Sequence, residues 1–113
     1  MFGAWSWQCP ETVILTEGPK DVLRLNEVGF HNSAAIFGTS ISKYQLEILK
    51  GCKTQRLILC FDNDEAGIIA CKKIVEQCKK DFHIEIPKLG DYSDIGEIPV
   101  KDKFWGHLHD FTH

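Results

Sequence analysis

The carboxylates of Asp62 and Asp64 are the side chains in this chain best placed to do chemistry. They lie one residue apart, between the apolar run 57–61 and a segment with the residue spacing of a helix. An apolar run of this length is typical of a buried strand in a parallel sheet. In open α/β sheets, ligands bind where such strands end. Because Mg²⁺ prefers oxygen ligands, the acidic pair predicts a site for a divalent metal ion.

Strands that alternate with helices are needed to position this pair. Apolar and β-branched runs predict strands at 12–16, 33–37, 57–61 and 83–86. Helices are predicted to begin at Pro19, after the N-cap Ser42, and at Glu65, the last running to about Lys80. This alternation requires right-handed crossovers. We therefore expect an α/β fold whose central four-stranded sheet is mainly parallel and flanked by helices.

A parallel sheet would bring together acids that are far apart in the sequence. Each predicted strand is followed by polar or glycine residues, and in a parallel sheet all of these lie at one edge. The residues concerned are Glu17, Gly38-Thr39-Ser40, Asp62 with Asp64, and Asp91 with Asp94. Crowded carboxylates raise one another's pKa unless a cation neutralises them. A metal site is the simplest explanation of the cluster.

Simpler explanations remain open for parts of this pattern. Asp62 or Asp64 could cap the following helix, because aspartate is favoured at that position. The motif also begins like a calcium loop, but Lys73 stands where such a loop requires glutamate, which rejects an EF-hand. The turn at Gly38 is too short for a P-loop. Capping alone explains neither the second acid of the pair nor Glu17 after another strand.

The composition favours an intracellular globular protein. The 113 residues have a formal net charge of -3, and the 5 cysteines lack the spacing of a zinc site. An acidic total does not exclude nucleic-acid contacts through local lysines. The sequence shows neither the roughly 18 apolar residues of a membrane span nor the pattern of a signal peptide. We expect a cytoplasmic protein in which most cysteines are inert, buried side chains.

The chain has the length of one domain. We place this domain at 12–100, between an N-terminal extension at 1–11 and a C-terminal tail at 101–113. Both flanks carry aromatic side chains, which we expect to cap the core, with base stacking or a partner interface as the alternative. These aromatic residues are Trp5, Trp7, Phe104, Trp105 and Phe111.

Taken in order, these motifs resemble those of the Toprim domain. The motifs are Glu17-Gly18, Gly38-Thr39-Ser40, the segment 62–67 and the segment 90–94, each after one predicted strand. The similarity is greatest to bacterial DnaG-type primases and phage primase-helicases, and it covers about 13–98. It implies a Rossmann-like Toprim fold with a site for Mg²⁺, where Mn²⁺ is also possible and zinc is not expected.

The resemblance also implies roles for individual acids. It makes Glu17, Asp62 and Asp64 the catalytic and metal-binding residues, with Glu17 also able to handle protons. Asp91 corresponds to a further metal-binding acid. The lysine that precedes this acid in the family's pattern is replaced here by glycine, which leaves Asp94 as a rival.

Other residues are expected to support the reaction. Asp21 is the aspartate of the Glu-Gly-x-x-Asp pattern. It would lie behind the metal ligands and hold them in their orientation. The glycine turn after the second strand is a place where the backbone could approach a phosphate, and lysines could contact phosphates directly. The candidates are Gly38, Thr39, Lys20, Lys43 and Lys72.

The implied function is Mg²⁺-dependent nucleotidyl transfer by a DNA primase, which makes RNA primers for DNA replication. Metal on the acids would bind the triphosphate of a ribonucleotide that a primer 3′-hydroxyl attacks. The zinc module and basic subdomain of such primases cannot be read here, so we expect a fragment or a partner-dependent protein.

Expected partners are single-stranded DNA or RNA, nucleoside triphosphates, and other primase domains or a helicase, with no membrane. The alternatives are a small Toprim nuclease that cleaves RNA or DNA, and a non-catalytic module that binds nucleic acid or replication proteins.

Overall fold

The computed structural model of the chain describes residues 11–38, 40–52 and 54–112. In these residues, four strands form one sheet in the order β2-β1-β3-β4, and every neighbouring pair is parallel. The strands are β1 (Thr12–Thr16), β2 (Ser33–Ala35), β3 (Arg56–Leu59) and β4 (His83–Glu85). The predicted α/β fold with a four-stranded parallel sheet is confirmed.

Three strands end one or two residues earlier than predicted. β2 stops before Phe37, whose φ of 59° is left-handed backbone that an extended strand cannot contain. β3 stops at Leu59 because its pairing with β1 ends there, although Cys60 and Phe61 remain buried. β4 stops at Glu85, which is its last residue paired with β3. Apolar character therefore extends beyond the hydrogen-bonded strands.

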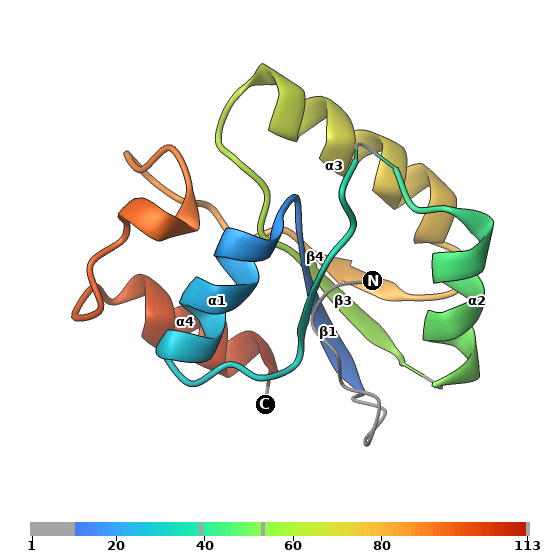
Figure 1. Cartoon of the computed structure of the whole chain (residues 1–113), viewed down its shortest axis with the longest axis horizontal. Coiled ribbons are helices and arrows are strands. Elements are labelled where there is room, and N and C mark those ends of the chain that lie inside the picture. The colour runs from blue at the N-terminus through green and yellow to red at the C-terminus, as the bar shows by residue number, and fades with distance from the viewer. Residues whose placement is uncertain (1–10, 39, 53, 113) are drawn as a thin grey trace.

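Helices lie on both faces of the sheet (Figure 1). Buried side chains of α2 and α3 pack with Leu15 and Leu57 on one face, and those of α1 and α4 pack with Ile14 and Ile58 on the other. Successive residues of a strand point to opposite faces, which explains why the strands are apolar throughout. The helices are α1 (Pro19–Glu27), α2 (Lys43–Gly51), α3 (Glu65–Cys78) and α4 (Phe104–Thr112), with a 3₁₀ helix η1 (Ile95–Glu97).

Local sequence determines where the helices begin. Pro19 occupies the first turn of α1, where its missing N–H costs nothing. Ser42 and Gln45 form a capping box at α2, each side chain accepting a hydrogen bond from the other residue's backbone N–H. α1 and α3 both begin within a few residues of the end of a strand. Their N-termini therefore lie at the edge of the sheet where the acids were expected.

The C-terminal segment belongs to the core. Phe104, Trp105 and Leu108 of α4 are buried, and the Phe104 and Trp105 rings meet edge to face at 5.1 Å. These aromatics cap the core as expected, whereas Trp5 and Trp7 lie outside the described residues. The division into a domain at 12–100 with flanking segments stays a prediction.

Cys60, Cys71 and Cys78 are free thiols in apolar surroundings. Cys60 and Cys78 are buried, and Cys52 and Cys71 are partly buried. Burial raises the pKa of Cys78 to about 11 and also raises the pKa of Cys60 and Cys71. These three thiols therefore stay protonated at neutral pH, in agreement with an inert role.

Among the described residues, the structure contains no helix that is both long and apolar enough to cross a lipid bilayer.

Candidate active site at the carboxyl edge of the sheet

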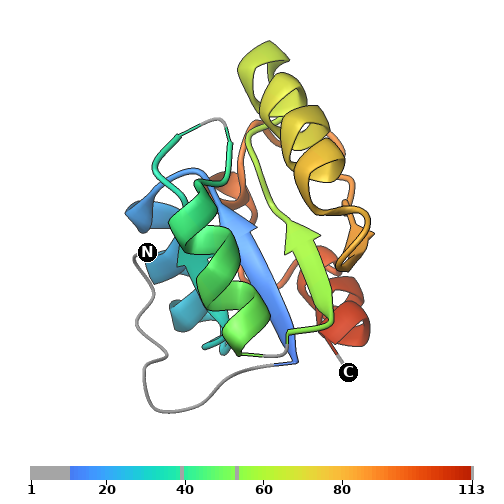
Figure 2. The ribbon, with the colours of Figure 1, turned by 90° about the vertical axis from the view of Figure 1, so that its right-hand side faces the viewer.

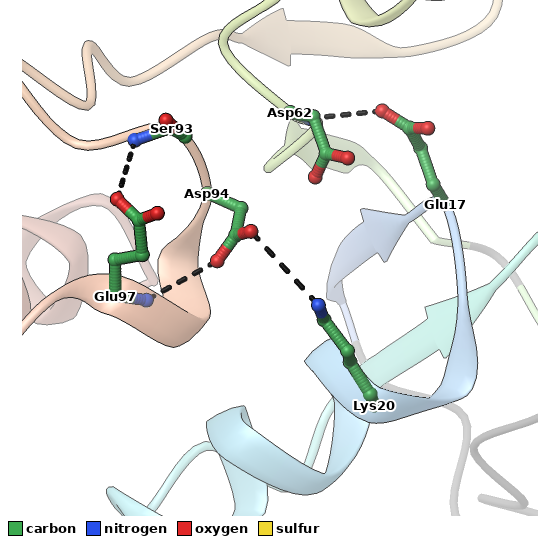
Figure 3. A network of polar contacts seen from close by, with 6 residues as sticks. All are labelled: Glu17, Lys20, Asp62, Ser93, Asp94 and Glu97. Carbon is green, nitrogen blue, oxygen red and sulfur yellow. Dashed lines mark hydrogen bonds and ion pairs between the residues drawn. The ribbon is translucent and has the colours of Figure 1, made fainter.

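The strands β1 and β3 point to the same edge of the sheet (Figure 2), and acidic residues follow them there. Glu17 follows β1, Asp62 follows β3, and Asp94 precedes η1. Oε1 of Glu17 accepts a hydrogen bond of 2.9 Å from the backbone N–H of Asp62. The carboxylates of Asp62 and Asp94 point into the same space (Figure 3). The fold thus brings together acids from three separate segments of the sequence.

Asp62 shows the effects of burial and of crowded negative charge. Burial raises its pKa, and the charges of Glu17, Asp94 and Asp64 raise it further, while Lys20 lowers it. The ionised form of Asp62 is therefore disfavoured by its surroundings. A cation bound among these carboxylates would reverse that effect, because an opposite charge favours the ionised form.

Asp21 is a buried carboxylate in the first turn of α1. It is only 4% exposed, and within the described part of the chain its Oδ1 has no hydrogen-bond partner. Burial, followed by the charges of Asp62 and Asp94, raises the pKa of Asp21 to about 6. Leaving a buried carboxylate oxygen unpaired is costly. This cost is consistent with a cation that is bound nearby in the working protein.

Asp64 caps α3. Its Oδ1 accepts a hydrogen bond of 2.7 Å from the backbone N–H of Gly67. The capping explanation thus applies to Asp64, while the carboxylate of Asp62 points toward the other acids (Figure 3). Gly67 leaves no room for a side chain, because a Cβ there would overlap the carbonyl oxygen of Asp62. The role of Asp64 as a metal ligand stays a prediction.

Asn63 joins the two acidic loops of the site. Its backbone N–H donates to the carbonyl of Ser93 at 2.6 Å, and its side-chain amide donates to the carbonyls of Gly90 and Tyr92 at 3.2 and 3.3 Å. The motif alone did not distinguish Asn63 from its neighbours. The one indication in the sequence was its residue type, because the primary amide of asparagine has two N–H groups that can donate to two backbone carbonyls.

Of the two acids in the fourth loop, Asp94 is the one that faces the other carboxylates. It accepts a hydrogen bond of 3.1 Å from the N–H of Glu97, and its charge raises the pKa of both Asp62 and Asp21. Asp91 is exposed and is not among the charges that act on Asp62. A metal-binding role for Asp91 stays a prediction.

The candidate phosphate-binding residues are mostly at the surface. Nζ of Lys20 lies 3.9 Å from Oδ2 of Asp94, although 77% of the Lys20 side chain is exposed. Lys43, Lys72 and Gly38 are also exposed, on α2, on α3 and in the turn after β2. Thr39 lies outside the described residues. Phosphate contacts by all five stay predictions.

The donor set fits a hard cation. In the described ranges, no three Asp, Glu, His or Cys side chains already stand close enough together to hold a metal ion. Glu17, Asp62 and Asp94 nevertheless offer only carboxylate oxygens, and Asp21 adds an unpaired one. Mg²⁺ needs only one or two protein carboxylates because it keeps several of its waters. The residues at this edge therefore fit Mg²⁺.

The sequence matches a family model described as Toprim-like over residues 14–98. The match contains all the acids of the candidate site, from Glu17 to Asp94.

Several similar proteins are DNA primases. A DNA primase of Listeria innocua is 35% identical over 99 residues, which are 83% of this chain and 16% of the primase. A DNA primase DnaG of Methanococcus aeolicus is 35% identical over 90 residues, covering 80% of this chain and 19% of that protein. An uncharacterized protein of Mycoplasma genitalium is 32% identical over 97 residues, covering 86% of this chain and 41% of that protein. The chain thus spans less than half the length of each of these relatives.

Proposed function

Because the chain belongs to the Toprim-like family and is similar to DNA primases, we propose that it is the catalytic domain of a primase. The proposed reaction is Mg²⁺-dependent nucleotidyl transfer that makes RNA primers in the cytoplasm. The observation that carries the proposal is the group of carboxylates at one edge of the sheet, where Glu17 accepts a 2.9 Å hydrogen bond from the N–H of Asp62 and the carboxylates of Asp62 and Asp94 point into the same space (Figure 3). Phosphoryl transfer depends mainly on positioning and on neutralising charge, which a metal held by such a group can supply.

In this proposal, Glu17, Asp62 and Asp94 hold the metal, and Asp64 and Asp91 are the further ligands that the family resemblance implies. Bound Mg²⁺ would neutralise the charge that develops on phosphate oxygens. Glu17 has a second task, because its 2.9 Å hydrogen bond holds the backbone of Asp62 in place. The acid that follows β1 therefore positions the acid that follows β3.

The chain spans about a sixth of the Listeria primase, so the activity of a whole primase requires other domains. We propose single-stranded DNA or RNA and nucleoside triphosphates as ligands of this domain. Other primase domains or a helicase are the proposed protein partners. In their absence we expect metal binding, but not template-directed primer extension.

A titration with Mg²⁺ or Mn²⁺, followed by backbone amide NMR, tests the site. We expect shifts at Glu17, Asp62 and Asp94 that Asp62→Asn abolishes, since asparagine keeps the size of aspartate and removes its charge. Asp110→Asn is the matched control, because Asp110 is exposed on α4. Comparing Asp94→Asn with Asp91→Asn shows which acid binds metal, and we expect Asp94→Asn to weaken binding more.

Two results would contradict the proposal. Metal-dependent shortening of a labelled strand that is lost in Asp62→Asn would replace primase with nuclease. The absence of site-specific shifts at millimolar Mg²⁺ or Mn²⁺ would favour a module that binds nucleic acid or replication proteins without catalysis.

A further inference from the structure

An apolar groove lies beside the candidate site, between α3 and the segment that follows β4. Its volume is about 880 Å³. The groove exists because β4 is short: Glu85, opposite Ile58, is its last paired residue, while the chain after β3 stays buried as far as Phe61. Pro87 lacks the N–H that would continue the ladder. Within the described residues, the end of β3 therefore has no strand beside it on this side.

The surface of the groove is mainly hydrophobic. Ile68 on the α3 wall and Ile86 on the opposite wall are each 50% exposed. Large apolar side chains that remain exposed on facing walls mark a binding surface and are not part of the hydrophobic core. The other apolar residues of the lining are Leu59, Phe61, Cys71, Val75, Pro87 and Leu89.

The groove is continuous with the acidic edge of the sheet. Asp62 and Asn63 belong to its lining. The carboxylate of Asp62 faces that of Asp94 (Figure 3). Asn63 holds the loop that leads to Asp94 through hydrogen bonds to the carbonyls of Gly90 and Tyr92. A ligand lying in the groove would therefore reach the carboxylates.

The charged residues of the groove favour an anionic ligand. Lys72 on α3 and Lys88 on the opposite segment both line it, and neither forms an ion pair with any described residue. Glu76, the acid of the lining besides Asp62, pairs with Lys79 at 3.2 Å. An apolar floor between two unpaired cations is complementary to a nucleobase and the phosphates that flank it.

The position of Lys72 favours a strand over a free nucleotide. Lys72 is eight residues beyond Asp64, or about 12 Å along the helix axis. A free nucleotide would carry all its phosphates at the acidic end of the groove. A strand has phosphates that continue along the groove toward Lys72.

We propose that this groove binds single-stranded nucleic acid on its way into the active site. A base lies against Phe61, Ile68 and Ile86, and the adjoining phosphates lie beside Lys72 and Lys88. This assignment deepens the proposed function and rests on it, because it takes the acids at the end of the groove to act on a phosphate.

A matched pair of double variants tests the groove. Ile68→Gln/Lys72→Gln alters its wall. Ile69→Gln/Lys73→Gln makes the same chemical change one residue further along α3, about 100° around the helix and outside the lining. The readout is fluorescence anisotropy of a labelled short oligothymidylate, first in EDTA and then with Mg²⁺. We expect the groove variant to bind about tenfold more weakly, because it loses an apolar contact with the base and a contact with a phosphate at once. The control should change less than about twofold.

Amide NMR of the wild-type chain provides a second measurement that needs no variant. Oligothymidylate should shift the amides of Ile68, Cys71 and Val75 more than those on the far side of α3. Binding in EDTA does not involve metal, so the loss of the metal site would leave this result intact and the two failures can be told apart.

Three outcomes would overturn the assignment. The first is that the wild type does not bind oligothymidylate at low salt, and the second is that the two double variants weaken binding equally. The third is that the groove variant no longer binds ATP but still binds the oligonucleotide. The third outcome would assign the groove to a free nucleotide.

Discussion

At the scale of single residues, Asp64 and Asp94 each use one carboxylate oxygen to cap a helix, at 2.7 and 3.1 Å from the N–H groups of Gly67 and Glu97. The carboxylate of Asp21 lacks such support at Oδ1. Burial, reinforced by the neighbouring acids, raises its pKa to about 6. Bringing the acids together without a cation therefore costs folding free energy at Asp21, which lies behind the candidate metal ligands.

Asp21→Asn tests this cost. The pKa of Asp21 rises from 3.8 to about 6 on folding, so the folded state holds the proton more tightly. Stability from this group is present below the unfolded pKa and is lost as the pH rises through about 6. We expect the variant to be more stable than the wild type near pH 7, by at most about 3 kcal/mol, and little changed near pH 4. Urea unfolding in EDTA across this range measures the difference. A difference that does not vary with pH would contradict it, and Asp110→Asn is the control.

At the scale of elements, the start of α3 joins the parts of the site. Asp64 caps the helix, Asn63 holds the fourth loop, and Gly67 packs against the backbone of Asp62. The geometry of the acids therefore depends on how closely this helix approaches the end of β3.

Gly67→Ala tests that dependence. The added Cβ would overlap the Asp62 carbonyl, so either α3 or Asp62 must move. We expect a loss of about 1–3 kcal/mol in the free energy of unfolding, together with weaker Mg²⁺ binding.

Gly106→Ala is its control, because a Cβ at this site on α4 meets nothing within 4 Å. This change should stabilise the protein by about 0.5–1 kcal/mol, since alanine favours a helix more than glycine does. Thermal or urea unfolding measures both effects. Equal effects of the two substitutions would show that the contact at Gly67 does not constrain Asp62.

The sequence predicts these elements well where the cause is local. Pro19 and Ser42 mark helix starts because capping involves neighbouring residues. The ends of the strands are predicted less well, because hydrogen-bonded pairing stops where the neighbouring strand turns away. The same limit applies to the site. The parallel sheet predicts that Glu17 and Asp62 converge, whereas the hydrogen bonds of Asn63 and the closer approach of Asp94 depend on how the fourth loop folds.

At the scale of the whole molecule, α4 supports the face of the sheet that carries α1 and η1. Arg24 of α1 donates a 2.6 Å hydrogen bond to the carbonyl of Ile98 and lies 6.0 Å from the Trp105 ring centroid. Nε1 of Trp105 donates to the carbonyl of Pro99 at 2.9 Å. Asp21 and Asp94 lie on α1 and at the start of η1, so their placement depends on the C-terminal helix.

Trp105→Ala tests whether α4 is part of this support. The indole is 7% exposed and packs against Phe104 and Phe30, so its removal leaves a cavity in the core. We expect the free energy of unfolding to fall by about 3–5 kcal/mol. Mg²⁺ binding by the folded fraction should also weaken, because the segment that follows η1 loses the hydrogen bond from Trp105 to the carbonyl of Pro99. Asp110→Ala on the exposed side of α4 should stay within about 0.5 kcal/mol of the wild type. Urea unfolding with and without Mg²⁺ measures both quantities. If Trp105→Ala matched this control, residues 101–113 would be a dispensable tail and the domain at 12–100 would fold without them.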